Sequence, residues 1–240
     1  MKSKNAFFAL FILMFAMSAV AKAGEEEKTE FRNIKNYHAV EVSDGIDLFI
    51  SMGSEEGVKV VADSDIIGDV KTEVKKGTLY ITCDQKGLFN IFNWSWGSKS
   101  RQVYVTVKEL KRIVASAGSD VKSGNLLEGD RVEVEASSGS DVDLEMVCRY
   151  ISLKASSGSD VRLRGSAEVF SSDVSSGSDV NARQLEAVLC EVSASSGSDI
   201  TVHALEKIIA KASSGGDVVY YGNPLQKDIG ETSGGDVTGR

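Results

Sequence analysis

A six-residue motif that recurs seven times in the second half of the chain constrains the fold more than any other feature. Its first copy, Ser116–Val121, reads Ser-Ala-Gly-Ser-Asp-Val, and its last is Thr232–Val237. The glycines of successive copies are 21, 19, 19, 20, 18 and 19 residues apart. A short, steady period is typical of repeat architectures, in which each unit buries its apolar face against the next.

The residues around each motif alternate between apolar and polar. Before Gly139, the segment Val132–Ala136 reads Val-Glu-Val-Glu-Ala, and after it Val142–Leu144 reads Val-Asp-Leu. Alternation with a period of two is the pattern of a strand buried on one face. Each repeat is therefore expected to carry two short strands joined by a Ser-Gly-Ser corner, where glycine tolerates a positive φ.

The period selects among the β-repeat folds. A propeller blade needs ~40 residues, about twice this spacing, and a helical repeat conflicts with the period of two. We predict an all-β fold, a right-handed parallel β-helix or β-solenoid with coils of about 19–20 residues. Before Gly234 the inward positions hold Lys227, Ile229 and Glu231, so this coil is expected to be a terminal cap.

Residues 1–23 read as a secretory signal peptide. Lys2 and Lys4 precede the apolar run Ala6–Val20, and residues 21–23 form a small-x-small cleavage site. The run has ~15 residues, fewer than the ~20 of a spanning helix. No cysteine follows it, so a lipoprotein acylation site is not expected.

The rest of the chain divides into an irregular β region, 24–110, and the regular repeats, 111–240. The irregular glycine spacing of the first region leaves two arrangements open, which are degenerate coils continuous with the repeats or a small capping β-subdomain. Residues 31–110 read as strands separated by turns, and examples are 39–42, 47–51, 58–62, 78–82 and 102–107.

Composition excludes several partners. The formal net charge is −8, and it becomes −11 when the three lysines of the expected signal peptide are removed. An acidic chain is a poor match for nucleic acid or an anionic membrane surface. There are three cysteines, so at least one thiol is unpaired, and Cys190 falls on the apolar side of an alternating run and is expected to be buried.

Several segments, in the order in which they occur, resemble one protein family. Glu41–Leu48, Gly77–Ile81 and Val103–Leu110, leading into Gly118–Val121, resemble the "putative auto-transporter adhesin, head GIN domain" family, which is common in secreted proteins of Bacteroidetes. Residues 45–47, Gly-Ile-Asp, stand at the position of the family's Gly-Ile-Asn or Gly-Ile-Asp signature. The resemblance implies a β-helical fold and a surface or periplasmic location. Many members carry a lipoprotein cysteine, which this sequence lacks.

An aspartate closes the corner of every repeat. In stacked coils these carboxylates would lie ~5 Å apart, and their repulsion would raise some of their pKa values. They could cap the corners by accepting hydrogen bonds from serine hydroxyls and turn amides. They could also bind Ca²⁺, which prefers oxygen ligands, and no other cofactor is expected. The calcium candidates are Asp141, Asp160, Asp179 and Asp199.

An aromatic cluster is the second candidate site. Both tryptophans of the chain, Trp94 and Trp96, lie close to Phe89 and Phe92, between glycine-containing segments. The four rings could pack on the solenoid or plug its end. They could instead form a protruding loop that contacts a glycan, a protein partner or a second copy of the chain.

The leading hypothesis is an exported, non-catalytic binding or adhesion module in the periplasm or at the cell surface, with a glycan or a surface protein as its partner. An alternative is a structural, self-assembling envelope protein whose aromatic cluster forms a homo-oligomer. A carbohydrate-active enzyme is the weakest hypothesis, because an acid in every coil indicates a structural device. The sequence also lacks a nucleophile elbow and a phosphate loop, and its two histidines, His38 and His203, are far apart.

Overall fold

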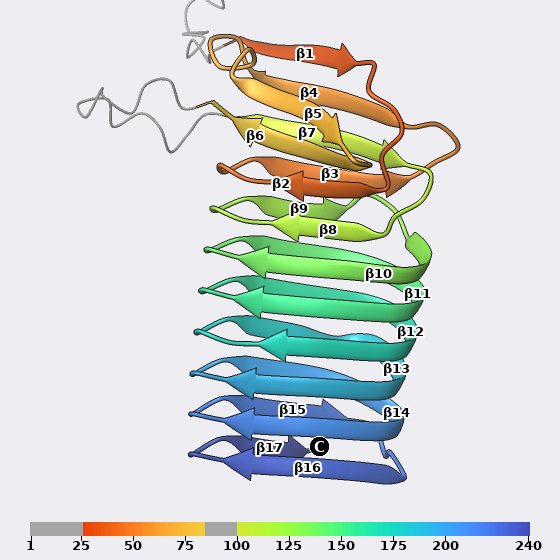
Figure 1. Ribbon diagram of the computed structural model, residues 1–240, viewed down its shortest axis with the longest axis vertical. Helices are drawn as coiled ribbons and strands as arrows, with labels where there is room; N and C mark the ends of the chain where they lie inside the picture. The colour runs from red at the N-terminus through yellow and green to blue at the C-terminus, as the bar shows by residue number, and fades with distance from the viewer. Residues whose placement is uncertain (1–25, 85–99) are drawn as a thin grey trace, which may run out of the picture.

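The fold is a solenoid built of strands. The structure is a computed structural model and describes residues 26–84 and 100–240. These residues form one 17-stranded sheet and contain no helix (Figure 1). As the chain descends in Figure 1, the front strands run to the left and the rear strands return to the right, which is a right-handed winding. The all-β parallel solenoid predicted from the repeat is confirmed.

The regular coils pair in parallel, with equivalent residues opposite each other. In β11 to β14 each coil is one long strand that bends round the edge opposite the corners, which differs from the two short strands expected. Between β11 and β12 the ladder is continuous through the bend, where Met146 pairs with Gly165 and Cys148 with Ala167. The next two pairs shift register near the bend, at Arg162/Arg164 and Ala182/Glu186, and the strands still continue. The strands are β10 (Leu127–Ser137), β11 (Asp141–Ser156), β12 (Asp160–Val174), β13 (Asp179–Ser195) and β14 (Asp199–Ser213).

Each corner turns on two successive residues with positive φ. Ser138 has φ 55° and Gly139 has φ 69°, and the same pair recurs in the other corners. The amide of Gly139 donates to the carbonyl oxygen of Ser157 in the next coil at 3.1 Å. Glycine is suited to the second position because it adopts a positive φ without a Cβ clash.

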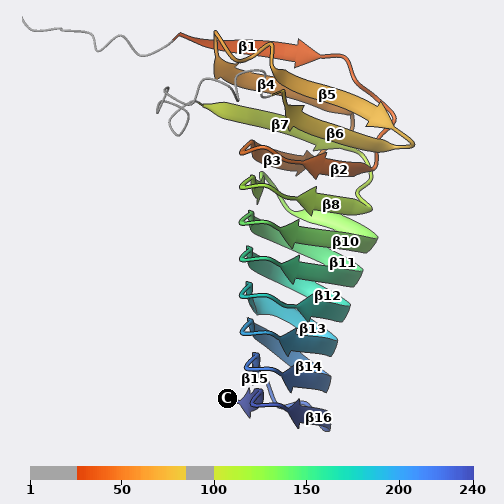
Figure 2. The same cartoon turned by 60° about the vertical axis from the view of Figure 1, so that its left-hand side comes forward.

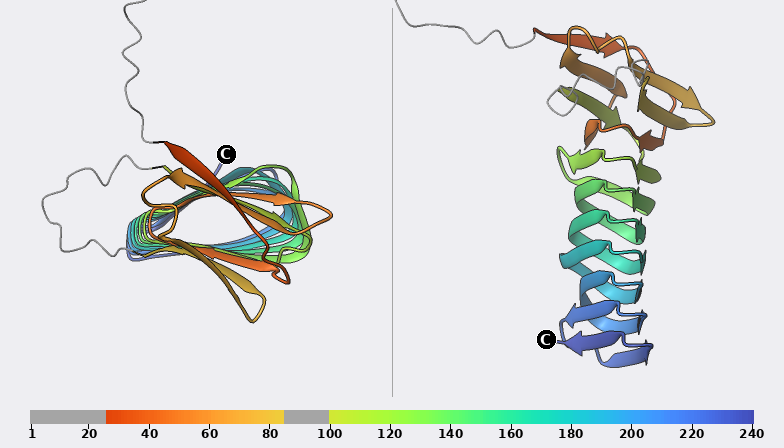
Figure 3. Two further views of the ribbon diagram at one scale, coloured as in Figure 1. Left: turned by 90° about the horizontal axis from the view of Figure 1, so that it is seen from above. Right: turned by 90° about the vertical axis from the view of Figure 1, so that its left-hand side faces the viewer.

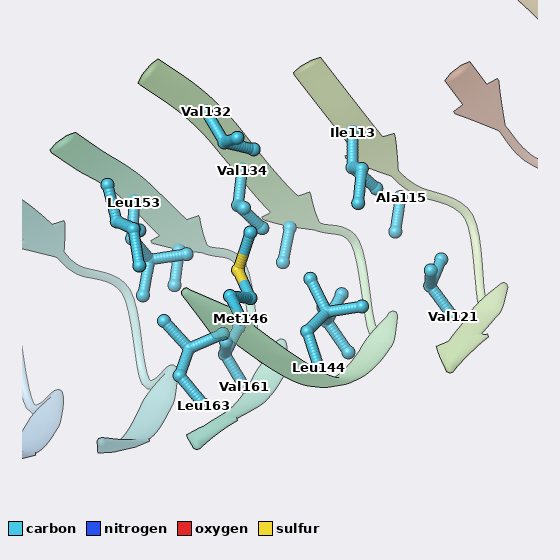
Figure 4. Packing of buried hydrophobic residues seen from close by; sticks show 14 of the residues in the cluster. Ile113, Ala115, Val121, Val132, Val134, Leu144, Met146, Leu153, Val161 and Leu163 are labelled. Carbon is cyan, nitrogen blue, oxygen red and sulfur yellow. The ribbon is translucent and has the colours of Figure 1, made fainter. Parts of the chain in front are cut away.

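The core is one dry column along the solenoid axis. Val134, Leu144, Met146 and Leu153 are almost completely buried and contact side chains of the coils above and below (Figure 4). Burying a side chain of this size contributes roughly 1.5–3 kcal/mol. Because every inward row repeats, the coils stabilise one another in series.

The N-terminal region combines the two arrangements left open by the sequence. β2 (Ala39–Val42) and β3 (Asp47–Met52) stack in parallel on β8 (Arg112–Ala115) and β9 (Asp120–Ser123), as a further coil. Above it lies a cap with antiparallel pairs (Figures 2 and 3). The cap strands are β1 (Glu27–Arg32), β4 (Gly57–Asp63), β5 (Val70–Lys75), β6 (Thr78–Cys83) and β7 (Arg101–Val107). Most of β1 precedes the region that the sequence predicted as strands.

The opposite end consists of β15 (Asp217–Tyr221), β16 (Gln226–Thr232) and β17 (Asp236–Gly239). Lys227 and Glu231 face positions that hold Ile208 and Ala212 in the preceding coil, and both are exposed. A carboxylate oxygen of Glu231 accepts a hydrogen bond from the amide of Val237 at 2.9 Å. Within the ranges described, no helix is long and apolar enough to cross a membrane.

Candidate functional site

The aspartates that close the corners form a continuous ladder. Each is paired in register with its equivalent in the next coil, as the repeat predicted. The ladder also includes Asp47, which pairs with Asp120. Its members are Asp47, Asp120, Asp141, Asp160, Asp179, Asp199, Asp217 and Asp236.

Asp47 joins the ladder because residues 45–47 are themselves a corner. Asp44 and Gly45 have φ 67° and 68°, like the corner pairs of the repeats. The next corner glycine, Gly118, is 73 residues further along the sequence, so this corner does not appear in the repeat spacing. The Gly-Ile-Asp triplet is therefore the first step of the solenoid.

A groove of about 520 Å³ runs along the ladder across five coils. One wall consists of the ladder from Asp120 to Asp199, whose ionised carboxylates offer acceptor oxygens and no donors. The other wall is the outward row two residues further along each strand, which mixes cationic, acidic and neutral polar groups. That row comprises Lys122, Asp143, Arg162, Asn181 and Thr201.

The ladder carboxylates influence one another electrostatically. Partial burial raises the pKa of Asp141, and the negative charges of Asp120 and Asp160 raise it further. Burial and the neighbouring Asp179 and Asp217 raise the pKa of Asp199 in the same way. Like charges one coil apart disfavour ionisation, so Asp141 and Asp199 hold their protons more tightly than isolated aspartates.

The expectation that the aspartates cap the corners was wrong. In the described residues, no hydrogen bond reaches the carboxylates of the ladder from Asp120 to Asp217. From Asp120 to Asp199 the residue before each aspartate is a buried serine, and this serine caps the corner: Ser140 Oγ donates to the carbonyl oxygen of Ala115 at 3.1 Å. Ser140 Oγ also accepts from the amide of Ser137 at 3.0 Å. The serine points into the corner, whereas the next residue points out of the sheet.

Calcium binding stays a prediction for the four candidate aspartates. The described ranges hold no group of three or more His, Cys, Asp or Glu side chains placed to bind a metal ion. Calcium takes six to eight oxygen ligands. Between two coils the ladder brings only two carboxylates together, and the second row adds the cations Lys122 and Arg162 to the same groove.

The second wall contains a charge cluster at its centre. Asp143 Oδ1 lies 2.9 Å from an Arg164 guanidinium nitrogen, and Asp143 Oδ2 lies 3.6 Å from one of Arg162. Asn181 and Thr201 continue the row with neutral groups that both donate and accept. The groove therefore places an acceptor-only wall opposite a mixed wall, repeated at ~4.8 Å along its length.

The aromatic candidates Phe89, Phe92, Trp94 and Trp96 lie outside the described residues. Another aromatic pair extends the second wall of the groove into the cap, where Phe49 pairs with Lys122. Phe49 and Tyr104 stack with ring centroids 4.9 Å apart, and the Lys59 ammonium lies 3.8 Å from the Tyr104 centroid. The pair joins strands more than 50 residues apart, so no local pattern signals it.

The cysteines are not reactive groups. All three are buried free thiols, as expected for Cys190. Burial raises the pKa of the Cys148 thiol to about 11 and that of Cys190 to about 12. Thiols with raised pKa values are poor nucleophiles and poor metal ligands at neutral pH.

Solved structures share this architecture. A putative adhesin from Bacteroides fragilis superposes with a TM-score of 0.81 at 20% identity, covering 90% of this chain and 98% of its own. A putative lipid binding protein from Parabacteroides distasonis superposes with a TM-score of 0.68 at 18% identity, and the match covers 89% of this chain and 96% of that protein. A putative adhesin from the same species has a TM-score of 0.67 at 16% identity, and the match covers 90% of this chain and 97% of that protein. No match was found among curated proteins.

Sequence comparison agrees with the resemblance noted above. The profile of one family matches residues 36–224, which include the Gly-Ile-Asp corner, the cap strands β4 to β7 and most of the repeats. The chain therefore belongs to the family described as "Putative auto-transporter adhesin, head GIN domain".

Proposed function

We propose that this protein is an exported, non-catalytic adhesion module of the periplasm or cell surface. Its groove along the aspartate ladder would contact an extended partner, either a glycan or a surface protein. The observation that carries the proposal is a groove that continues over five coils, with an aspartate from every coil on one wall and a polar or charged side chain from every coil on the other. A regular groove of this kind suits a partner that is itself extended and repetitive.

Three features support this proposal. The family and two of the similar structures carry the word adhesin in their descriptions. The in-register sheet fixes the backbone beneath both walls, so binding requires little reordering of the backbone. The carboxylates recur in every coil, whereas a catalytic acid and base would be an exception within the repeat.

Binding arrays with groove variants test the proposal. The purified protein is applied to glycan arrays and to surface-protein extracts, with Arg162→Ala and Asn181→Ala as groove variants. The matched control is Lys154→Ala, an exposed position on the other arm of the coil. We expect the groove variants to weaken binding at least 10-fold and the control to leave it unchanged. Equal binding by all variants would remove the groove from consideration.

Self-assembly is a second candidate function, favoured by a different observation. Apolar side chains are exposed along the bent edge of the solenoid, among them Val147 at 42%, Val188 at 37% and Leu205 at 42%. Exposed apolar side chains gathered on one edge favour an interface. Light scattering on the double variant Val188→Lys/Leu205→Lys would distinguish the two functions. If the protein self-assembles through this edge, the substitutions should lower its molar mass in solution to that of the monomer.

A further inference from the structure

A hollow of about 470 Å³ lies where the cap meets the regular coils. The later coils bend along this same edge of the solenoid, which is at the right of Figure 1. The first residues of β2, β6 and β8 and the early part of β10 surround it. Its volume falls within the ~300–1,000 Å³ of typical small-molecule sites. We call it the junction pocket, and its principal lining residues are His38, Ala39, Thr78, Leu110, Arg112 and Arg131.

The topology explains why the edge is hollow here. From β11 onward the strand continues round the bend and covers the edge with large side chains, such as Arg149 and Tyr150. β2, β6 and β8 instead begin at this edge. Their outward row contains the small residues Thr78 and Ala39 next to Arg112, so space is left above the Arg112 side chain.

The pocket has an apolar floor and a charged rim. Leu110 and Ala39 are 2% and 5% exposed and supply the floor. Acids and cations alternate around the rim, and most of them are already paired. The rim pairs are Lys111–Glu109 at 3.1 Å, Arg112–Glu135 at 3.0 Å and Arg149–Asp130 at 2.9 Å.

Arg131 is the exception on this rim. Its side chain makes no ion pair with any residue in the described part of the chain. The guanidinium carbon lies 4.5 Å from the centroid of the Tyr150 ring, so the group is held by a cation–π contact. A guanidinium stacked on a ring keeps its in-plane N–H donors available, and their fork matches a carboxylate.

We propose that the junction pocket binds a carboxylate-bearing sugar, such as a uronic acid residue. Its carboxylate would accept hydrogen bonds from the free N–H groups of Arg131. Its C–H face would rest on Ala39 and Leu110, and its hydroxyls would donate to the rim carboxylates of Glu109 and Glu133. A neutral sugar would leave the Arg131 donors without this charged partner.

This site is separate from the groove. The groove lies beside the corners, between the ladder and its second row, whereas the junction pocket lies where the later coils bend. No residue lines both. The groove variants Arg162→Ala and Asn181→Ala should therefore leave sugar-acid binding unchanged, and either proposal can fail without the other.

Titration calorimetry with sodium glucuronate, glucose and acetate tests the proposal, together with amide chemical-shift mapping around Gly129. We expect glucuronate to bind at least 10-fold more tightly than glucose or acetate. Arg131→Gln should weaken glucuronate binding at least 10-fold. Arg183→Gln is the matched control, because Arg183 also lies over an aromatic ring, that of Tyr221, at 4.2 Å.

Three results would overturn the inference. One is unchanged glucuronate affinity in Arg131→Gln. Another is equal affinity for acetate, which would make Arg131 a general anion contact without a sugar site. The third is the absence of both heat and shift changes near Gly129 at high glucuronate concentration.

Discussion

Neutralising one rung of the aspartate ladder should stabilise the fold. Asp141 has a charged neighbour on each side, Asp120 and Asp160, and its carboxylate accepts no hydrogen bond in the described residues. The substitution Asp141→Asn preserves the shape of the side chain and removes two repulsions, which outweigh the attractions to Lys122 and Arg162 that it also removes. It should therefore raise the free energy of unfolding near pH 7.

The magnitude follows from the coil spacing. Two unit charges ~5 Å apart in a solvent-exposed setting repel by about 0.8 kcal/mol in water, so two neighbours contribute about 1.6 kcal/mol before screening. At 0.15 M ionic strength the Debye length of ~8 Å reduces this to about 0.9 kcal/mol, and at 1 M to about 0.3 kcal/mol. We expect Asp141→Asn to raise the free energy of unfolding by about these amounts, with a smaller increase at higher salt concentration.

The pH dependence gives a second readout. Because the folded-state pKa values of Asp120, Asp141 and Asp199 are raised, the folded state holds more protons than the unfolded state just above pH 3.8. These groups therefore stabilise the fold fully below that pH, and the contribution is lost as pH rises through the folded pKa values. The advantage of Asp141→Asn should accordingly vanish at about pH 3.

Urea unfolding followed by circular dichroism measures both dependences. The matched control is Asp228→Asn, the same exchange at an exposed aspartate of β16 outside the ladder. Destabilisation by Asp141→Asn, or a gain that does not respond to salt, would refute like-charge repulsion as the dominant interaction. Loss of stability that Ca²⁺ removal reproduces in the unsubstituted protein would instead show a cation bound to the ladder.

Three further substitutions test the core and the corners by the same unfolding assay. Ser172→Ala should raise the free energy of unfolding by about 1 kcal/mol, because Ser172 Oγ is buried without a hydrogen-bond partner. A lower free energy of unfolding would mean that this hydroxyl does have a partner. Ser159→Ala should cost about 1–2 kcal/mol, because it leaves the Ala136 carbonyl oxygen, 3.1 Å from Ser159 Oγ, without this donor. Gly165→Ala should cost at least about 2 kcal/mol, since φ is +117° and a Cβ would lie 2.0 Å from the Met146 carbonyl oxygen. An unchanged free energy of unfolding in Gly165→Ala would mean that the backbone at the bend shifts easily to make room for the Cβ.

The regular half of the molecule could be predicted from the sequence because its information is local. Alternation over a few residues defines each strand, and the glycine of each corner, such as Gly139, marks the turn. The constant period then places equivalent residues such as Asp141 and Asp160 in register. No long-range knowledge is needed, because every coil meets a near copy of itself.

The candidate site was predicted only in part. The sequence located the ladder and its outward-facing aspartates such as Asp141, but it does not reveal that Ser140, on the corner interior, makes the capping hydrogen bonds. The groove depends on the second row as well. The residue type in this row changes from coil to coil, for example from Lys122 to Asp143 to Arg162. The aromatic candidates around Trp94 lie outside the described residues, so the structure does not bear on them.

By itself the sequence determined the coil period, the inward rows, the corners and the stacking of aspartates from Asp120 onward. Only the tertiary structure decided that Asp47 belongs to the same ladder, that the cap pairs antiparallel, and that Ala39 and Arg131 border one hollow. The physical reason is distance along the chain. These contacts join segments separated by tens of residues, and their register is set by the packing of whole strands instead of by any local pattern.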